Sequence, residues 1–204
     1  RAVGRIRDEL ETLGLAENTV IIYTSDHGCH FCTRNAEYKR SCHESSIRVP
    51  LIATGPGFTS GDTVEEMVSL IDLPPTLLAA AGAQVPDTFQ GRPVQPLVAD
   101  SADDWPEEAF VQISEAECGR AIRTPRWKYG VTADPDDCFE YWAGSDIYSE
   151  TYLYDLDADP HERKNLVDDP DHATTREQLR ERLIARMTAA GEDAPTITPV
   201  SSSS

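Results

Sequence analysis

The chain has 204 residues, 39% hydrophobic and 26% charged, which is typical of a soluble globular domain or a piece of a larger one. Acidic residues outnumber basic ones by 36 to 18, and the net charge of −18 disfavours nucleic acid and anionic membranes as partners because like charges repel. No apolar run approaches the ~20 residues that span a bilayer. The sequence opens at Arg1 without a signal peptide or an initiator Met. We therefore expect the natural N-terminus to lie upstream, and a cytoplasmic or an exported location both stay open.

The basic residues are almost all Arg; the three Lys are Lys39, Lys128 and Lys164. Acid enrichment with few Lys is typical of proteins that work in concentrated salt, because salt screens the repulsion between carboxylates. A halophilic source and an ordinary acidic protein are both compatible with this composition. The first alternative predicts that stability falls when salt is removed.

In chain order, the first predicted elements alternate between helix and strand. Leu and Ile at helical spacing predict an amphipathic helix over residues 2–14, and the β-branched run at 19–26 predicts a buried strand of a parallel sheet. A polar stretch at 29–46 follows, and a loop of this length inside a compact domain is usually functional or disordered. A second short strand is expected within 48–57, closed by Gly-Pro-Gly. This order indicates an α/β arrangement, whose ligands bind beyond the carboxyl ends of the strands.

The predicted elements that follow are short helices and then short strands. Residues 64–81 predict two turns or short helices broken at Pro74-Pro75, with Pro75 starting a helix that ends at Gly82. A linker rich in Pro and Asp is expected at 83–107, followed by short strands that predict a small antiparallel sheet. Residues 173–190 predict a helix that covers this sheet, and a disordered tail is expected at 201–204. The apolar stripe of that helix consists of Leu179, Leu183, Ile184 and Met187.

Two neighbouring residues at the end of the first strand are candidate metal ligands. The carboxylate of Asp26 and the imidazole of His27 are both ligands of divalent cations. Taken alone, Asp-His-Gly is more often an ordinary turn. The loop that follows adds context to this pair, because it contains Lys39, His43 and Glu44-x-x-x-Arg48.

Five Cys residues form no disulfide scaffold, because their number is odd and their density is low. The Cys29-x-x-Cys32 spacing is similar to a zinc or redox motif, but the second half of a zinc ribbon and a thioredoxin-like context are missing. Buried or loop thiols are the favoured interpretation. The five are Cys29, Cys32, Cys42, Cys118 and Cys138.

These motifs, in this order, resemble the sulfatase family. TSDHG, YK and HESSIRVPLIATGPG match its S-D-[NH]-G, Lys and E-x-x-x-R-x-P patterns, and LYDLDADPHERKNL matches its L-Y-D-L-x-x-D-P-x-E-x-x-N-L pattern. The resemblance implies an α/β fold of the alkaline-phosphatase-like type: part of a large mixed or parallel sheet flanked by helices, then a small antiparallel sheet with a C-terminal helix. Residues 1–100 would be the C-terminal part of the catalytic domain, and 101–204 an α+β subdomain with a disordered tail.

The resemblance also implies residue roles. Asp26 and His27 would ligate a calcium or magnesium ion, and Lys39 would bind the sulfate group of a sulfated small molecule or carbohydrate. Chemistry alone suggests His43 as a substrate-contact or proton-transfer residue. Glu44 and Arg48 are expected to form a structural ion pair, or Arg48 to face the substrate.

The family's nucleophile, a formylglycine made from Cys or Ser in C/S-x-P-x-R, is expected in a missing N-terminal half, because no Cys here is followed by x-Pro-x-Arg. A further acidic metal-ligand pair is expected there too. The fragment alone should be inactive, and its parallel strands would lack their neighbours.

Several alternatives stay open. The enzyme could be a phosphodiesterase or phosphonate monoester hydrolase of the same superfamily, or a non-catalytic homologue that binds anions or metals. The oligomeric state cannot be read from the sequence.

Two further predictions concern turn residues and aromatic residues. Asp155, Asp157, Asp159 and Asn165 are expected to be turn and cap residues rather than a calcium loop. Sheet packing is expected for Trp105, Trp127, Tyr129, Tyr141 and Trp142, with a few possible exceptions in a cleft wall at 134–149.

Overall fold

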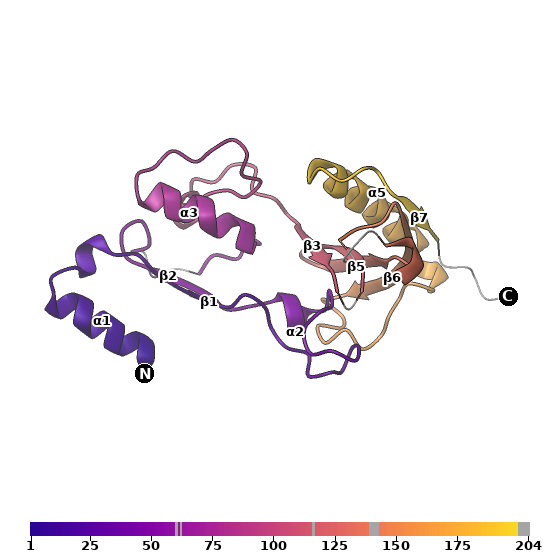
Figure 1. Cartoon of the computed structure of the whole chain (residues 1–204), viewed down its shortest axis with the longest axis horizontal. Helices are drawn as coiled ribbons and strands as arrows, with labels where there is room; N and C mark the ends of the chain where they lie inside the picture. Colours follow the sequence, from indigo (N-terminus) through magenta and orange to yellow (C-terminus); the bar gives the residue numbers. More distant parts are fainter. Residues whose placement is uncertain (60, 62, 116, 139–142, 200–204) are drawn as a thin grey trace. The chain divides into compact units, whose positions relative to one another are not determined.

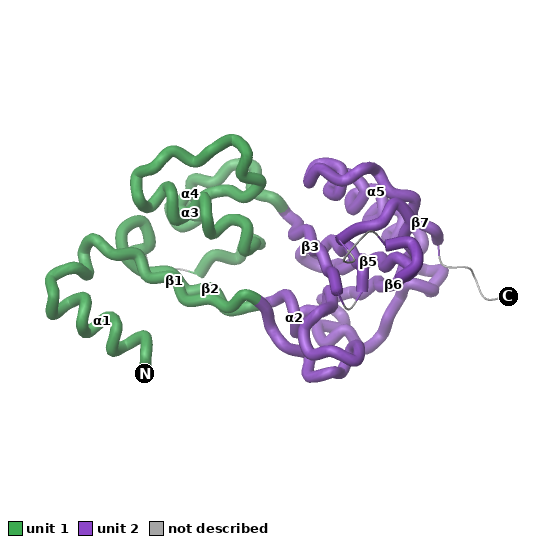
Figure 2. Tube along the Cα trace, viewed as in Figure 1, with its two compact units in different colours: residues 1–26, 49–106 green, residues 27–48, 107–204 purple. Residues whose placement is uncertain are grey.

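The computed structural model describes residues 1–199 except 60, 62, 116 and 139–142 (Figure 1). It is a mixed α/β structure that divides into two compact units (Figure 2). Unit 1 comprises Arg1–Asp26 and Val49–Pro106, and unit 2 comprises His27–Arg48 and Glu107–Ser204. The segment 27–48 therefore groups with the C-terminal residues. The domain boundary predicted between residues 100 and 101 stays a prediction.

Unit 1 begins with the predicted amphipathic helix, α1 (Ala2–Thr12), and the single turn η1 (Ala16–Asn18). The β-branched run forms β1 (Ile21–Thr24), and Leu51–Thr54 forms β2. These strands pair antiparallel, Ile21 opposite Thr54, and neither has a fully buried residue. The sequence predicted the strand correctly, but the pairing found among the described residues is not parallel. A β-branched run indicates a strand that can be buried on both faces. It does not indicate whether the neighbouring strand runs parallel or antiparallel to it.

The prolines of unit 1 lie in the first turn of a helix, as the sequence predicts for Pro75. After the turn η2 (Leu70–Asp72), α3 runs over Leu73–Ala80 with Pro74 and Pro75 in its first turn. Backbone N–H groups in the first turn of a helix have no intrahelical partner. A Pro residue, which lacks this N–H, therefore loses no helical hydrogen bond there. The helix stops before Gly82, whose φ of +68° is left-handed. A short helix, α4 (Gln95–Val98), completes the unit.

Unit 2 is built on a five-stranded sheet in the order β3-β4-β5-β6-β7. The first four strands pair antiparallel, and β6 and β7 pair in parallel, so the predicted antiparallel sheet carries one parallel edge strand. The other elements are the short helices α2, η3 and η5 and the long C-terminal helix α5. Their bounds are β3 Ala109–Ile113, β4 Gly119–Arg123, β5 Trp127–Thr132, β6 Ile147–Asp155, β7 Thr196–Thr198, α2 Glu44–Ile47, η3 Pro135–Asp137, η5 Pro170–His172 and α5 Ala173–Ala189.

The core of unit 2 lies between this sheet and α5, which covers one face of it (Figure 1). The stripe predicted on α5 is confirmed: Leu179, Leu183 and Met187 are buried, and Ile184 packs at the margin. They meet sheet residues such as Ile122, Tyr129 and Leu153. Within the described part of the chain, no helix has both the length and the apolar character that crossing a membrane would require.

In the acidic turn after β6, side-chain oxygens accept hydrogen bonds from backbone N–H groups. One carboxylate oxygen of Asp159 accepts hydrogen bonds from the backbone N–H groups of Arg163 (2.5 Å) and Lys164 (2.8 Å). The side-chain oxygen of Asn165 accepts from Leu153 and Val167. This confirms the turn-and-cap interpretation and leaves these oxygens committed to the backbone.

The predicted aromatic packing is partly confirmed. Tyr129 is fully buried in the sheet and Trp127 packs against the same core. Trp105 lies instead in unit 1, outside this sheet, where its indole N–H donates to the carbonyl of Met67. Tyr141 and Trp142, and with them the centre of the cleft wall suggested at 134–149, lie outside the described residues.

Candidate functional site

His27 is held in one tautomer by its neighbour. Its Nδ1 lies 2.7 Å from the carbonyl oxygen of Gly28. A carbonyl only accepts, so Nδ1 carries the proton and donates it, and Nε2 keeps its lone pair. Nε2 in turn lies 3.0 Å from Nζ of Lys39, which donates to it. The imidazole thus has the tautomer that metal-ligating histidines also use, with a backbone carbonyl fixing the ring.

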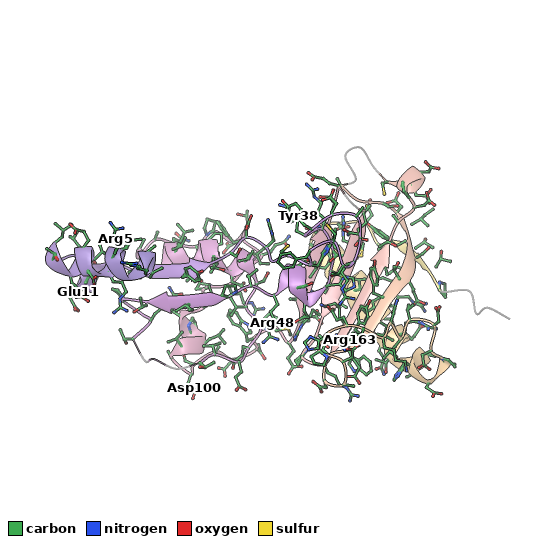
Figure 3. All side chains as sticks on the ribbon, turned by 90° about the horizontal axis from the view of Figure 1, so that it is seen from below. Arg5, Glu11, Tyr38, Arg48, Asp100 and Arg163 are labelled. Carbon is green, nitrogen blue, oxygen red and sulfur yellow. The ribbon has the colours of Figure 1, made fainter. Side chains whose placement is uncertain are left out.

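Tyr38 completes this group. Its ring lies edge-on to His27, with the centroids 6.2 Å apart, and Nζ of Lys39 is 5.5 Å from its centroid. Half of the Tyr38 side chain is exposed (Figure 3). We call His27, Tyr38 and Lys39 the His27–Lys39 cluster. It presents an ammonium group, an imidazole lone pair and an aromatic face together.

The backbone after His27 is fixed by close packing. The N–H of Gly28 donates to the carbonyl of Ser46 (2.7 Å). A Cβ added to Gly28 would lie 2.1 Å from the carbonyl oxygen of Ser45. Only glycine fits here, because any side chain would overlap the backbone of α2. The Gly of Asp-His-Gly therefore anchors His27 to α2.

Asp26 is the last residue of unit 1, and its side chain is exposed; one carboxylate oxygen lies 3.5 Å from Oγ of Ser25. Among the described residues, no group of three or more His, Cys, Asp or Glu side chains gathers in a way that could hold a metal ion. The chemistry of Asp26 and His27 fits a divalent cation, since one offers carboxylate oxygens and the other an imidazole nitrogen, Nε2, that carries no proton. Two protein ligands do not complete a coordination shell, so further ligands would have to join them.

His43 is buried in unit 2, with 2% of its surface exposed. Its two nitrogens lie 3.1 Å from Oγ of Ser41 and 3.2 Å from the hydroxyl of Tyr154, and its ring packs against Tyr152. Burial, helped by the positive charges of Arg34 and Lys128, lowers the pKa of His43 to about 3. The proton-transfer role predicted for His43 stays a prediction, and this geometry favours a structural role.

Glu44 is engaged more closely by the sheet than by Arg48. The predicted Glu44–Arg48 pair spans 4.0 Å, and 78% of the Arg48 side chain is exposed (Figure 3). Glu44 lies 2.8 Å from Nζ of Lys128 and 3.3 Å from Arg123. Burial works to raise the pKa of Glu44, but the charges and hydrogen bonds of Lys128 and Arg123 outweigh it and lower that pKa. Arg48 is thereby left at the surface, where a substrate could reach it.

The sequence analysis did not single out Lys128, Glu162 or Glu117. Lys128 and Glu162 are buried and lie 2.5 Å apart. Burial raises the pKa of Glu117 to about 7, against a hydrogen bond to Tyr152 that lowers it. The rarity of Lys in this chain was a usable signal for Lys128, whereas nothing in the sequence distinguishes Glu117 from the many other acids.

All the cysteines are free thiols. Cys29 is partly exposed and Cys32 is exposed, and they belong to no three-residue metal-binding group in the part of the chain that is described. Burial raises the pKa of Cys42 to about 12, which leaves it an unreactive thiol. This agrees with the interpretation of the cysteines as loop or core residues.

Comparisons with known proteins agree with this picture. Residues 36–189 match the family described as N-sulphoglucosamine sulphohydrolase, C-terminal. Arylsulfatase K of Canis lupus familiaris is 32% identical over 175 residues, covering 81% of this chain and 31% of that protein. The chain thus spans about a third of the length of such curated relatives.

Two solved structures share the fold. One, a protein in complex with its substrate D-glucosamine-2-N,6-O-disulfate, is 27% identical with a TM-score of 0.79, over 95% of this chain and 39% of that one. The other is the phosphonate monoester hydrolase of Agrobacterium radiobacter, 26% identical with a TM-score of 0.72, over 91% and 38% of the respective chains.

Proposed function

Because the chain belongs to the sulfatase family represented by the N-sulphoglucosamine sulphohydrolase C-terminal region, we propose that it forms part of an active site that hydrolyses sulfate esters. The observation that carries the proposal is the His27–Lys39 cluster, directly after Asp26. The cluster offers a cationic donor and a metal-competent imidazole within one hydrogen bond of each other.

Lys39 would bind the sulfate group. A sulfate ester is an anion whose hydrolysis builds further negative charge on the sulfate and the leaving oxygens, so fixed positive donors lower the barrier. The ammonium of Lys39 supplies a compact charge with three donors. Its hydrogen bond to His27 and its approach to the Tyr38 ring restrain the flexible stem.

Asp26 and His27 would hold the cation, calcium or magnesium. When bound, such an ion polarises an oxygen of the sulfate group. The lone pair on Nε2 of His27 can serve either the Lys39 ammonium or a cation. Cation binding by His27 would therefore release Lys39 to donate to the anion. The formylglycine nucleophile and the further acidic ligands are proposed to lie outside this sequence.

The substrate class we propose is a sulfated carbohydrate. Support comes from the fold neighbour that binds D-glucosamine-2-N,6-O-disulfate. The half-exposed ring of Tyr38 offers a face of the kind that stacks on sugar rings. Arg48, exposed beyond α2, is proposed as a further contact to the anionic substrate.

The test is a side-by-side assay of the full-length protein on an aryl sulfate and an aryl phosphodiester, with and without a chelator. We expect faster turnover of the sulfate, loss of turnover on chelation, and a fall in kcat/KM of about 100-fold or more in Lys39→Met. Wild-type kcat/KM in Lys39→Met would contradict the proposal.

A second candidate, phosphonate monoester or phosphodiester hydrolysis, is favoured by the Agrobacterium radiobacter neighbour. Faster turnover of the phosphodiester in the same assay would select it. Calcium binding without turnover of either ester would instead identify a non-catalytic homologue.

A further inference from the structure

Glu162 of unit 2 makes hydrogen bonds to the chain on both sides of Lys39. The bonded residues bound the stretch 34–44, which we call the Lys39 segment. The backbone carbonyl of Glu162 accepts a hydrogen bond from the guanidinium of Arg34 (2.7 Å). Its carboxylate oxygen Oε2 accepts from the backbone N–H of Glu44 (2.8 Å). Arg34 and Glu44 lie five residues on either side of Lys39.

The conformation of Glu162 indicates that this position is constrained. Its φ of +53° is left-handed, which costs a non-glycine residue on the order of 1 kcal/mol. Only 2% of its surface is exposed. A buried, left-handed glutamate persists only where surrounding contacts over-determine it, and here these contacts are the two hydrogen bonds to the Lys39 segment and an ion pair.

That ion pair is with Lys128 of β5. The ammonium of Lys128 is fully buried and lies 2.5 Å from Glu162 and 2.8 Å from Glu44. Arg123 of β4 also pairs with Glu44, at 3.3 Å. Two cations thus face two carboxylates, which is the balance that buried charges need. Lys128 therefore neutralises the carboxylate of Glu162 through Oε1, while Oε2 accepts the hydrogen bond from Glu44.

We propose that Glu162, neutralised by Lys128, is a positioning residue that fixes the segment 34–44 and with it the place of the Lys39 ammonium. The inference rests on the proposed function of Lys39. A sulfate-binding ammonium must sit where charge develops, and a misplacement of about 1 Å can cost a hundredfold in rate. The side chain of Lys39 is flexible, so its accuracy depends on the backbone beneath it.

The experiment uses the full-length protein with Glu162→Gln, which keeps the size of the side chain and removes its charge. We expect amide hydrogen exchange within residues 34–44 to accelerate at least tenfold, with exchange in β6 and α5 unchanged. We also expect kcat/KM for an aryl sulfate, per folded molecule, to fall at least tenfold.

The matched control is Glu150→Gln. Glu150 of β6 is another buried carboxylate of unit 2, but it pairs with Arg176 and Arg180 of α5. We expect it to lower stability without changing exchange at 34–44 or kcat/KM. Equal effects of the two variants, or unchanged exchange at 34–44 in Glu162→Gln, would overturn the proposal.

A second variant covers the case in which Glu162→Gln does not fold. Lys128→Met combined with Glu162→Met removes both charges and leaves no unpaired buried ion. It should fold and show the same accelerated exchange at 34–44; protection as in the wild type would overturn the proposal. Because exchange does not depend on turnover, normal turnover in Lys39→Met with fast exchange in Glu162→Gln would refute the proposed function and leave the positioning role standing.

Discussion

The two units of this chain are stabilised in different ways. Unit 2 has an apolar core between its sheet and α5, with a buried ion network beside it. In unit 1, the apolar side chains that are buried among the described residues are Phe58, Pro75 and Val94. Its helix α1 has no buried residue, and apolar side chains of its strands, such as Ile52, are exposed.

Unit 1 contains a group of buried polar hydrogen bonds around the start of α3, which we call the polar clasp. The carboxylate of Asp72 accepts hydrogen bonds from the backbone N–H groups of Ser69 and Arg92, both at 2.8 Å. The fully buried hydroxyl of Thr76 donates to the carbonyl of Asp72 (2.6 Å) and accepts from the N–H of Val94 (3.0 Å). The apolar residues that predicted buried elements in unit 1 are thus only partly buried, whereas the apolar stripe of α5 in unit 2 is buried against its sheet.

The largest expected effect is in the core of unit 2. Leu183→Ala removes a fully buried side chain and should destabilise unit 2 by about 3 kcal/mol, from lost burial and the cavity that remains. Ile52→Ala in unit 1, where 63% of the side chain is exposed, should cost less than about 0.5 kcal/mol. Urea unfolding followed by hydrogen exchange measures both units. Equal losses in the free energy of unfolding would contradict the view that the two units are stabilised in different ways.

Removing the polar clasp tests the same comparison from the side of unit 1. Asp72→Ala leaves two backbone N–H groups without their acceptor, so we expect unit 1 to lose about 2 kcal/mol while unit 2 keeps its stability. Hydrogen exchange of α3 compared with α5 reports this directly. The control is Asp87→Ala, an exposed acid of unit 1. Loss of protection in α5 would show that the units are not independent.

The pH dependence should be specific to unit 2. The pKa of Glu117 is raised to about 7 by burial, above the ~4.5 of an unfolded chain. Between these values the folded state binds more protons than the unfolded state, so stability falls as pH rises from about 4.5 to 7. His43, with its pKa lowered to about 3, acts oppositely between pH 3 and 6.5.

Glu117→Gln isolates the first effect. We expect it to remove a decline of roughly 1 to 2 kcal/mol between pH 4.5 and 7, after allowance for partial exposure. Thermal unfolding across this range, wild type against variant, makes the comparison. Parallel profiles would show that Glu117 titrates normally.

The smallest expected effect concerns salt. With a net charge of −18, self-repulsion should weaken the fold when salt is removed, by about 1 kcal/mol spread over the surface. The melting temperature should rise between 0.1 and 2 M potassium chloride. An unchanged melting temperature would remove the halophilic interpretation.

Much of unit 2 could be predicted from the sequence, because period and turn chemistry are local. The stripe of Leu179, Leu183 and Met187 and the caps at Asp159 and Asn165 were correctly predicted. The direction of the β1 neighbour was not, since strand composition does not encode it. For the site, the sequence suggested Asp26, His27 and Lys39, but the Glu44–Lys128–Glu162 network joins residues 34 to 118 positions apart and has no local pattern.

The central claim is that Lys39 binds the sulfate group, and inhibition by inorganic sulfate tests it most directly. The full-length protein is compared with Lys39→Met and with Lys164→Met, a control in which the Lys is exposed and only loosely paired with Asp169. We predict that the inhibition constant of sulfate rises at least tenfold in Lys39→Met and stays unchanged in Lys164→Met. The same inhibition constant in all three proteins would contradict the account.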